Sequence, residues 1–88
     1  MTVKIDKSYE KDTDKIRDQK LLLRIAEVID GIKTCNKTEE IKNLKKLKGG
    51  NEYYRIKIGD YRIGIIIKTQ EIIFVRFLHR KEIYRYFP

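Results

Sequence analysis

The sequence contains few residues that cross-link or interrupt a chain. Its single cysteine, Cys35, excludes an intramolecular disulfide and argues against a cysteine-ligated metal site. The single proline is Pro88, so no strand is interrupted. The longest apolar run, Ile63–Ile67, includes a glycine and is far shorter than the about 20 residues that span a membrane. Residues 1–6 lack the apolar core of a signal peptide. We therefore expect no membrane association and a reducing, cytoplasmic location.

Acidic residues are scarce relative to basic ones. Lys and Arg total 21 against 13 Asp and Glu, which gives a net charge of +8 in 88 residues. Domains typically hold about 100–150 residues, so we expect one domain and no separate cofactor domain. The positive charge favours a phosphate polymer as partner. It equally suits an acidic protein, and solubility alone would also explain it.

The first half of the chain carries helical signals. Val3–Asp6 alternates and predicts a short strand, after which Ser8 is placed to cap a helix that runs to about Ile16. Asp18 is placed to cap a second helix, and Thr38 to begin a short third one. The second helix has an apolar stripe at three- and four-residue spacing, formed by Leu21, Leu22, Ile25, Val28, Ile29 and Ile32. This stripe should pack on a sheet.

The second half has the period of two that is typical of strands. The expected strands are Tyr53–Ile58, Tyr61–Lys68 and Glu71–Leu78. Gly59-Asp60 and Thr69-Gln70 form the turns between them, and the middle strand is apolar enough to be central. His79–Phe87 leaves the sheet as one helical turn. The predicted fold class is α+β, with an N-terminal helical hairpin packed on one face of a small antiparallel β-sheet.

The Gly59-Asp60 turn places two cations directly opposite each other. Lys57 faces Arg62, and Arg55 faces Gly64, on the sheet face away from the helices. Like charges across a strand pair cost a few tenths to about 1 kcal/mol, and no carboxylate of these strands lies on that face. Such an uncompensated cost indicates function, and a polyanion laid across the sheet would relieve it. Alternatively, the cations extend into water or meet an acid from another element.

The last strand adds candidates to this face. If its hairpin has Lys68 opposite Glu71, Phe77 lies opposite Arg62, and His79 points the same way. Arg80 and Tyr84 follow just beyond the strand. A lone histidine or tyrosine is more often structural, but near a cationic face imidazole and phenol can exchange protons or stack on bases.

Three motifs in order resemble the RelE/ParE superfamily of bacterial and archaeal toxins. They are Leu47–Gly49, the hairpin Tyr54–Ile63, and His79–Tyr84. With the helices ahead of the sheet, the resemblance covers nearly all of the chain, which is read as a single RelE-like toxin domain over residues 1–88. It implies a toxin that a cognate antitoxin neutralises, with any oligomer formed through the antitoxin.

The resemblance implies one of two activities. The RelE branch enters the ribosomal A site and cuts mRNA there, and the ParE branch poisons DNA gyrase without nuclease chemistry. The positions here that match functional residues of the RelE branch are Arg55, Lys57, Arg62, His79, Arg80 and Tyr84. The glutamate base of one branch has no secure match, since Glu52 is only near its place. The general base is therefore left open.

Metal-independent, ribosome-dependent RNA cleavage is the activity that we expect, with no cofactor. The substrate 2′-OH attacks its own adjacent phosphate and leaves a cyclic phosphate and a 5′-OH, so no enzyme nucleophile is needed. Arg62 and Arg80 are expected to bind the phosphate and to stabilise the negative charge that develops on it, because arginine offers two donors and keeps its charge.

The other candidates have supporting roles. Arg55 and Lys57 position the RNA backbone, and Lys57 is also a possible base if neighbouring cations lower its pKa. Tyr84 stacks on a base or assists proton transfer, and His79 is an alternative acid or base. The basic run of Lys42, Lys45, Lys46 and Lys48 is expected to dock on ribosomal RNA, or to be only a solvated helix face.

Two other functions compete with the nuclease. One is a ParE-like gyrase inhibitor, against which Tyr84 and the cationic hairpin argue. The other is an inactive relic or nucleic-acid-binding protein whose only partner is an antitoxin. Exposed aromatic residues beside a cationic groove (Tyr53, Tyr84, Phe87) would suit an antitoxin peptide that folds as it binds.

Overall fold

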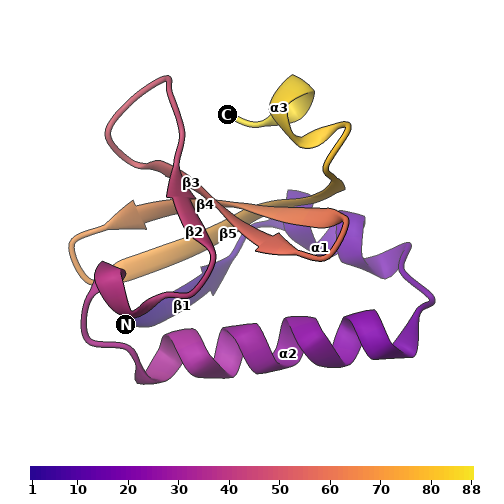
Figure 1. Ribbon diagram of the computed structural model, residues 1–88, viewed down its shortest axis with the longest axis horizontal. Helices are drawn as coiled ribbons and strands as arrows, with labels where there is room; N and C mark the ends of the chain where they lie inside the picture. The colour runs from indigo at the N-terminus through magenta and orange to yellow at the C-terminus, as the bar shows by residue number, and fades with distance from the viewer.

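The computed structural model describes residues 1–88 as a five-stranded sheet with helices on both of its faces (Figure 1). The elements are β1 (Thr2–Ile5), α1 (Lys7–Asp14), α2 (Gln19–Thr34), the 3-10 turn η1 (Thr38–Glu40), β2 (Leu44–Lys46), β3 (Tyr53–Ile58), β4 (Tyr61–Lys68), β5 (Glu71–His79) and α3 (Ile83–Tyr86). The strand order is β1-β5-β4-β3-β2, so β4 is central, as its apolar sequence predicts. The α+β class is confirmed. None of the helices has the length and apolarity to cross a membrane.

The sheet is mixed, and the prediction of an antiparallel sheet behind a helical hairpin is wrong in part. The short strand predicted over Val3–Asp6 is present as β1, but it pairs in parallel with β5, for example Val3 with Ile72. α1 then packs along β5, while α2 lies under the sheet (Figure 1). The parallel partner of β1 is almost 70 residues away in sequence, and no local pattern reports such a pairing.

Two aspartates cap the helices. Asp6, and not Ser8, is the N-cap of α1: hydrogen bonds from the Ser8 hydroxyl and amide stabilise its carboxylate and lower the pKa of Asp6. The helix ends at Asp14, two residues before the predicted end. Asp18 caps α2 as predicted, since its Oδ1 accepts from the amides of Lys20 at 3.0 Å and Leu21 at 3.2 Å.

The basic run before the glycine pair contains a strand that the sequence did not predict. β2 has three residues, and Lys45 pairs with Arg55 of β3. The short helix expected from Thr38 is only the 3-10 turn η1. A three-residue, lysine-rich strand has too few alternating apolar positions to be recognised from sequence.

The predicted hairpin registers are confirmed. Lys57 pairs with Arg62, and Lys68 pairs with Glu71. A β-bulge then interrupts β5: Gly64 pairs with Arg76, whereas the next residue of β4, Ile65, pairs with Phe74. Val75 is the extra residue. Each residue of β5 after Val75 therefore lies on the sheet face opposite to the one that an uninterrupted register predicts.

Two face assignments are therefore wrong. Phe77 pairs with Ile63 in the core rather than with Arg62. His79 pairs with Tyr61, and their ring centroids lie 5.6 Å apart. Because the Tyr61 ring stacks on Phe77, His79 points toward the helical side of the sheet and not toward the cations.

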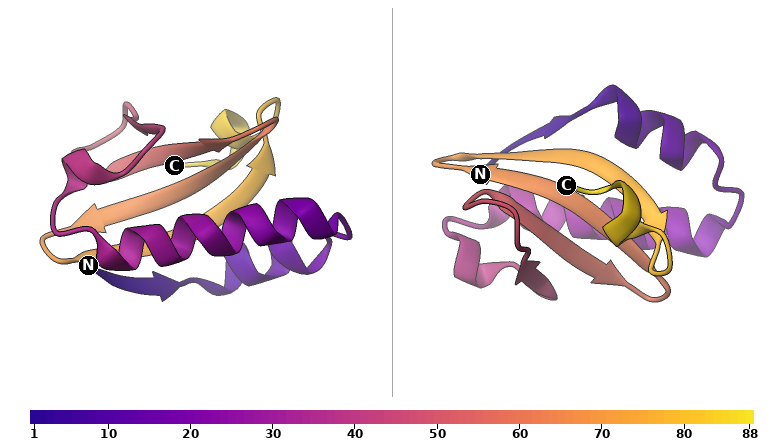
Figure 2. Two further views of the ribbon diagram at one scale, coloured as in Figure 1. Left: turned by 60° about the horizontal axis from the view of Figure 1, so that its bottom comes forward. Right: turned by 90° about the horizontal axis from the view of Figure 1, so that it is seen from above.

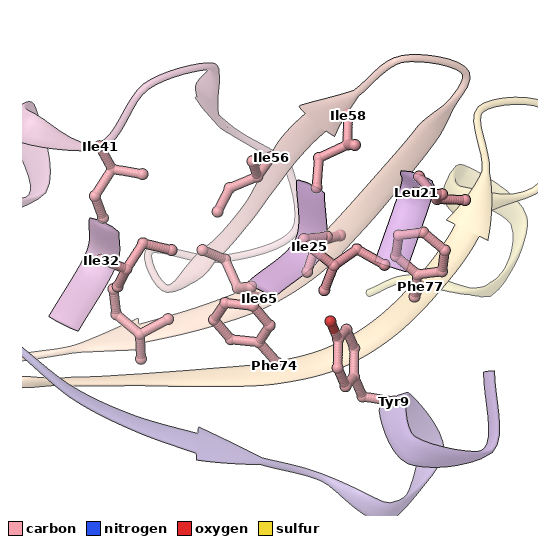
Figure 3. Packing of buried hydrophobic residues seen from close by; sticks show 12 residues of the cluster. Tyr9, Leu21, Ile25, Ile32, Ile41, Ile56, Ile58, Ile65, Phe74 and Phe77 are labelled. Carbon is pink, nitrogen blue, oxygen red and sulfur yellow. The ribbon is translucent and has the colours of Figure 1, made fainter. Parts of the chain in front are cut away.

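The core fills the space between α1, α2 and the sheet (Figure 3). Its best-buried members from the sheet are Ile56, Ile58, Ile63, Ile65, Ile72, Phe74 and Phe77. Leu21, Ile25 and Ile32 of the predicted stripe face them from α2. The remaining apolar residues of this stripe are only partly buried.

Tyr9 carries a buried hydroxyl with no hydrogen-bond partner, and its ring lies edge-on to Phe74 at 5.3 Å (Figure 3). Burial raises the pKa of Tyr9. An unsatisfied buried donor is costly, so Tyr9→Phe should raise the free energy of unfolding by about 1 kcal/mol in urea denaturation. Tyr86→Phe, at an exposed ring, is the control and should stay within about 0.5 kcal/mol. A loss of stability in Tyr9→Phe would mean that this hydroxyl is bonded in solution.

Candidate nucleic-acid interface

The sheet face opposite α2 carries two rows of cations. Residues paired across neighbouring strands share a face, so the pairings put Lys57 beside Arg62, and Lys45 beside Arg55. The two rows are two residues apart along β3, which is about 7 Å. The prediction that Arg55, Lys57 and Arg62 lie on one face is confirmed, and β2 adds Lys45. We call these four residues the cationic face.

No acid of the chain neutralises the cationic face. The salt bridges join Lys4 to Glu71, Arg76 to Asp12 and Arg80 to Asp60, and none of them involves Lys45, Arg55, Lys57 or Arg62. These side chains are exposed or half-buried. The alternative reading, in which an acid from elsewhere in the fold meets each cation, is therefore wrong for this group.

Backbone carbonyls hold the two arginines of the cationic face. Arg55 donates from Nη1 to the carbonyl of Asn43 at 2.8 Å, and its Nε is buried without a partner. Arg62 donates from Nη1 to the carbonyls of Gly59 and Tyr61, both at 2.9 Å. Each guanidinium keeps further N–H groups for a ligand, and its position is already restricted before a ligand binds.

Arg76 lies in the same row as Arg55 and Gly64 but is neutralised. Its Nε and Nη2 donate to the carboxylate of Asp12 at 2.8 and 3.2 Å, which raises the pKa of Arg76. Asp12 also accepts from the amide of Phe77 at 2.9 Å, and its side chain is 8% exposed. This arrangement is a structural link between α1 and the bulged part of β5. A lone arginine inside an apolar strand was the signal for it in the sequence.

The C-terminus folds over the cationic side of the sheet (Figure 2). The ring of Phe87 rests on Gly64, where an added Cβ would lie 2.6–2.9 Å from ring carbons. Tyr53 meets Phe87 edge-on at 5.8 Å, and Ile83 is fully buried. The expectation of an exposed Phe87 is therefore wrong, because Phe87 is only 3% exposed.

This contact gives a testable prediction. Gly64→Ala should displace Phe87 and lower the free energy of unfolding by about 1–3 kcal/mol, measured in urea. Gly31→Ala is the matched control, since nothing lies within 4 Å of its added Cβ and alanine favours a helix. Equal stability of the two variants would contradict the packing of Phe87 on the sheet.

Tyr84 lies beside the lysine run. It is 58% exposed, and it lines a groove of about 370 Å³ together with Lys45, Lys46, Lys48 and Phe87. Lys42 is separate: it lines another groove, between α2 and β3. Three of the four predicted RNA-binding lysines are thus brought together with the predicted tyrosine, and the reading of the run as a helix face is wrong.

Arg80 lies at the turn between β3 and β4. Its amide donates to the Asp60 carbonyl at 2.7 Å, and its Nε is 3.7 Å from the Asp60 carboxylate. Arg62 bonds to the neighbouring carbonyl of Gly59, so the two predicted phosphate clamps meet at one turn. His79 faces the other way, and its Nδ1 accepts from the amide of Lys81. The structure therefore places Arg62, Arg80 and Lys57 around the β3–β4 turn. Tyr84 lies beside the lysine run instead, and His79 points toward the helical side.

Comparisons with known proteins define the class of this chain. The family described as "ParE toxin of type II toxin-antitoxin system, parDE" matches residues 3–84. "Toxin RelE3" of Methanocaldococcus jannaschii is 42% identical over 89 residues, which cover all of both chains. The chain belongs to the ParE toxin family of type II toxin–antitoxin systems, within the RelE/ParE superfamily that its motifs resemble.

Solved structures agree with this assignment. The toxin in the crystal structure of the RelB-RelE antitoxin-toxin complex from Methanococcus jannaschii has a TM-score of 0.80 at 40% identity, over 97% of this chain and 99% of that one. The archaeal RelE-RelB complex from Pyrococcus horikoshii matches with a TM-score of 0.73 at 24% identity, over 90% of this chain and 93% of that one, which shows the shared fold alone.

Proposed function

We propose that the protein is the toxin of a RelBE-type toxin–antitoxin system and that it cuts mRNA in the ribosomal A site. The observation that carries the proposal is the cationic face, on which four cations converge without an acid of their own chain. An RNA backbone supplies the missing negative charge and releases counterions as it binds. Such a toxin acts in the cytoplasm, where mRNA is translated.

The proposed reaction uses the RNA as its own nucleophile. The 2′-OH loses its proton and its oxygen bonds to the adjacent phosphorus, while the bond to the 5′-oxygen of the next nucleotide breaks. The products are a 2′,3′-cyclic phosphate and a 5′-OH, which takes up a proton. Arg62 and Arg80 stabilise the extra negative charge on the phosphate as the new bond forms. Their common place at the β3–β4 turn supports this pairing.

The remaining residues position the RNA or move protons. Arg55 and Lys57 hold the RNA backbone on the sheet. Lys57 is also a candidate base, since it lies directly opposite Arg62 and forms no salt bridge. Tyr84 lines the groove that also contains Lys45, Lys46 and Lys48. These three lysines bind phosphates of the mRNA or of ribosomal RNA. Because His79 faces the helical side, it has no part in this mechanism.

A cognate antitoxin is the proposed protein partner. The similar structures from Methanococcus jannaschii and Pyrococcus horikoshii are complexes of a toxin with its antitoxin. The uncompensated cations and the exposed rings of Tyr84 and Tyr86 give an acidic, extended or helical peptide a surface on which to fold. Oligomers of this toxin would then form through the antitoxin.

Gyrase inhibition is the second candidate, because residues 3–84 match the ParE toxin family. One pair of assays separates the two functions. Purified protein should cut mRNA on programmed ribosomes and leave gyrase supercoiling unchanged. Inhibited supercoiling with intact mRNA would favour the ParE-like function, and inactivity in both assays with normal growth on overexpression would favour a relic.

Tyr84 gives a further prediction. If its ring stacks on a base, Tyr84→Phe should keep most of the cleavage rate, while Tyr84→Ala should lose about 10-fold or more, since stacking is worth roughly 1–3 kcal/mol per base. If its hydroxyl moves a proton, both variants should lose activity equally. Single-turnover cleavage on programmed ribosomes distinguishes these outcomes. Full activity of Tyr84→Ala would remove Tyr84 from the site.

A further inference from the structure

The turn between β3 and β4 is contacted by arginines from both faces of the sheet. α2 lies on the core side, yet the guanidinium of Arg24 reaches around to this turn: its Nη1 is 3.2 Å from the position that a Cβ on Gly59 would take. Gly59 is also the residue whose carbonyl accepts from Nη1 of Arg62 at 2.9 Å. Two guanidinium groups from different layers of the fold thus meet at one glycine.

The charges at this turn are unbalanced. Arg24, Arg62 and Arg80 lie around it, and Lys57 lies directly opposite Arg62. The only carboxylate bonded there is that of Asp60, whose side chain is 73% exposed and 3.7 Å from Arg80. Four positive charges therefore share one exposed negative charge, and they repel one another unless a polyanion lies between them.

Arg24 has no acid of its own. Arg24 and Glu27, which is one turn further along α2, both line the groove between α2 and β3, but no salt bridge joins their side chains. The residue is exposed, so its guanidinium is free to rearrange on a ligand. Holding a third arginine at a turn that already has two contributes nothing evident to the stability of the fold.

We propose that Arg24, Arg62 and Arg80 form one phosphate-binding site around the β3–β4 turn, and that Arg24 binds the RNA phosphate next to the one that is cleaved. This inference deepens the proposed function and rests on it. RNA phosphate is the ligand that fits best, because planar guanidinium groups bind phosphate oxygens with paired donors. The turn is also continuous with the cationic face through Lys57 and Arg62, so a strand bound on the sheet leaves it over Arg24.

Binding of a non-cleavable RNA tests the proposal separately from catalysis. The probe is a fluorescently labelled single-stranded 2′-O-methyl RNA of 12 nucleotides, followed by anisotropy between 50 and 300 mM salt. Arg24→Ala should weaken binding about fivefold or more and lower the slope of log K against log salt by about 0.7, the share of one phosphate contact on a single strand. Arg24→Lys keeps the charge and should keep the slope while losing part of the affinity.

Lys33→Ala is the matched control. It removes one charge from an exposed position of the same helix, nine residues and about 13 Å from Arg24, and should bind within twofold of the wild type. Thermal unfolding of both variants should coincide. Arg24→Ala that binds like Lys33→Ala would overturn the proposal, and so would a wild-type protein that does not bind the probe.

Two further outcomes separate this proposal from its alternatives. If Arg24→Ala keeps its RNA affinity but escapes neutralisation by the antitoxin, the turn binds an acidic protein and the assignment to RNA is wrong. If the wild type binds the probe through Arg24 but leaves mRNA on ribosomes intact, the phosphate site stands and the nuclease function fails. If neither mRNA cleavage nor RNA binding depends on Arg24, the proposed phosphate site is wrong and the nuclease function still stands.

Discussion

Replacing Arg62 with alanine should slow mRNA cleavage on programmed ribosomes by about 10²–10³-fold, the usual cost of losing one donor to the transition state. Arg62 is the residue that the central strand β4 contributes to the cationic face, and its guanidinium is already held by the carbonyls of Gly59 and Tyr61. The loss should appear in the rate at saturating protein, because the charge on the phosphate increases only as the transition state forms.

The control for Arg62→Ala is Lys68→Ala, which removes the same charge from the exposed far end of β4. Its cleavage rate should stay within twofold of the wild type. Arg62→Lys should recover only part of the activity, since an ammonium group cannot bind phosphate with two parallel donors. Undiminished cutting by Arg62→Ala would remove Arg62 from the mechanism.

Replacing Asp12 with alanine should lower the free energy of unfolding by about 3 kcal/mol. The substitution leaves the Arg76 guanidinium without its partner at 26% exposure and the Phe77 amide without an acceptor. Asp12→Asn should lose less, because its amide oxygen can still accept from the Phe77 amide. Urea denaturation measures both variants.

Asp14→Ala is the control for Asp12, since it removes the same charge from an exposed position of the same helix. It should change the stability by no more than about 0.5 kcal/mol. If Asp12→Ala and Asp14→Ala are equally stable, the link from α1 to β5 contributes little. A large loss in Asp12→Ala alone would confirm that this buried carboxylate holds the bulged segment in place.

The sequence predicts what local rules determine. The Gly59-Asp60 turn with alternating residues on both sides fixes the register of Lys57 against Arg62, and the structure has this register. The cap at Asp18 and the stripe on α2 are equally local. The three cations Arg55, Lys57 and Arg62 could therefore be assigned to one face before the structure was known.

Non-local contacts could not be predicted in this way. The bulge at Val75 has no glycine or other local signal, and it moves Phe77 and His79 to the other face. The parallel pairing of β1 and the packing of Phe87 on Gly64 join residues far apart in sequence. A short strand such as β2 forms because β3 offers it a partner.

The same division applies to the candidate site. Lys45 joins the cationic face only through its pairing with Arg55, and Arg24 reaches the β3–β4 turn only through the packing of α2. Neither residue belongs to the motifs that indicate the family. Residues that a tertiary contact brings to a site require the structure, even where the family is evident from the sequence.

Cleavage of an mRNA with a single 2′-deoxy nucleotide at the cut position, on programmed ribosomes, tests the proposed nuclease mechanism most directly. If the 2′-OH is the nucleophile, the all-ribose message gives an upstream fragment ending in a 2′,3′-cyclic phosphate, and the 2′-deoxy message stays intact at that position. Efficient cutting of the 2′-deoxy message would contradict this mechanism, because the cations of the sheet would then serve a reaction with a different nucleophile.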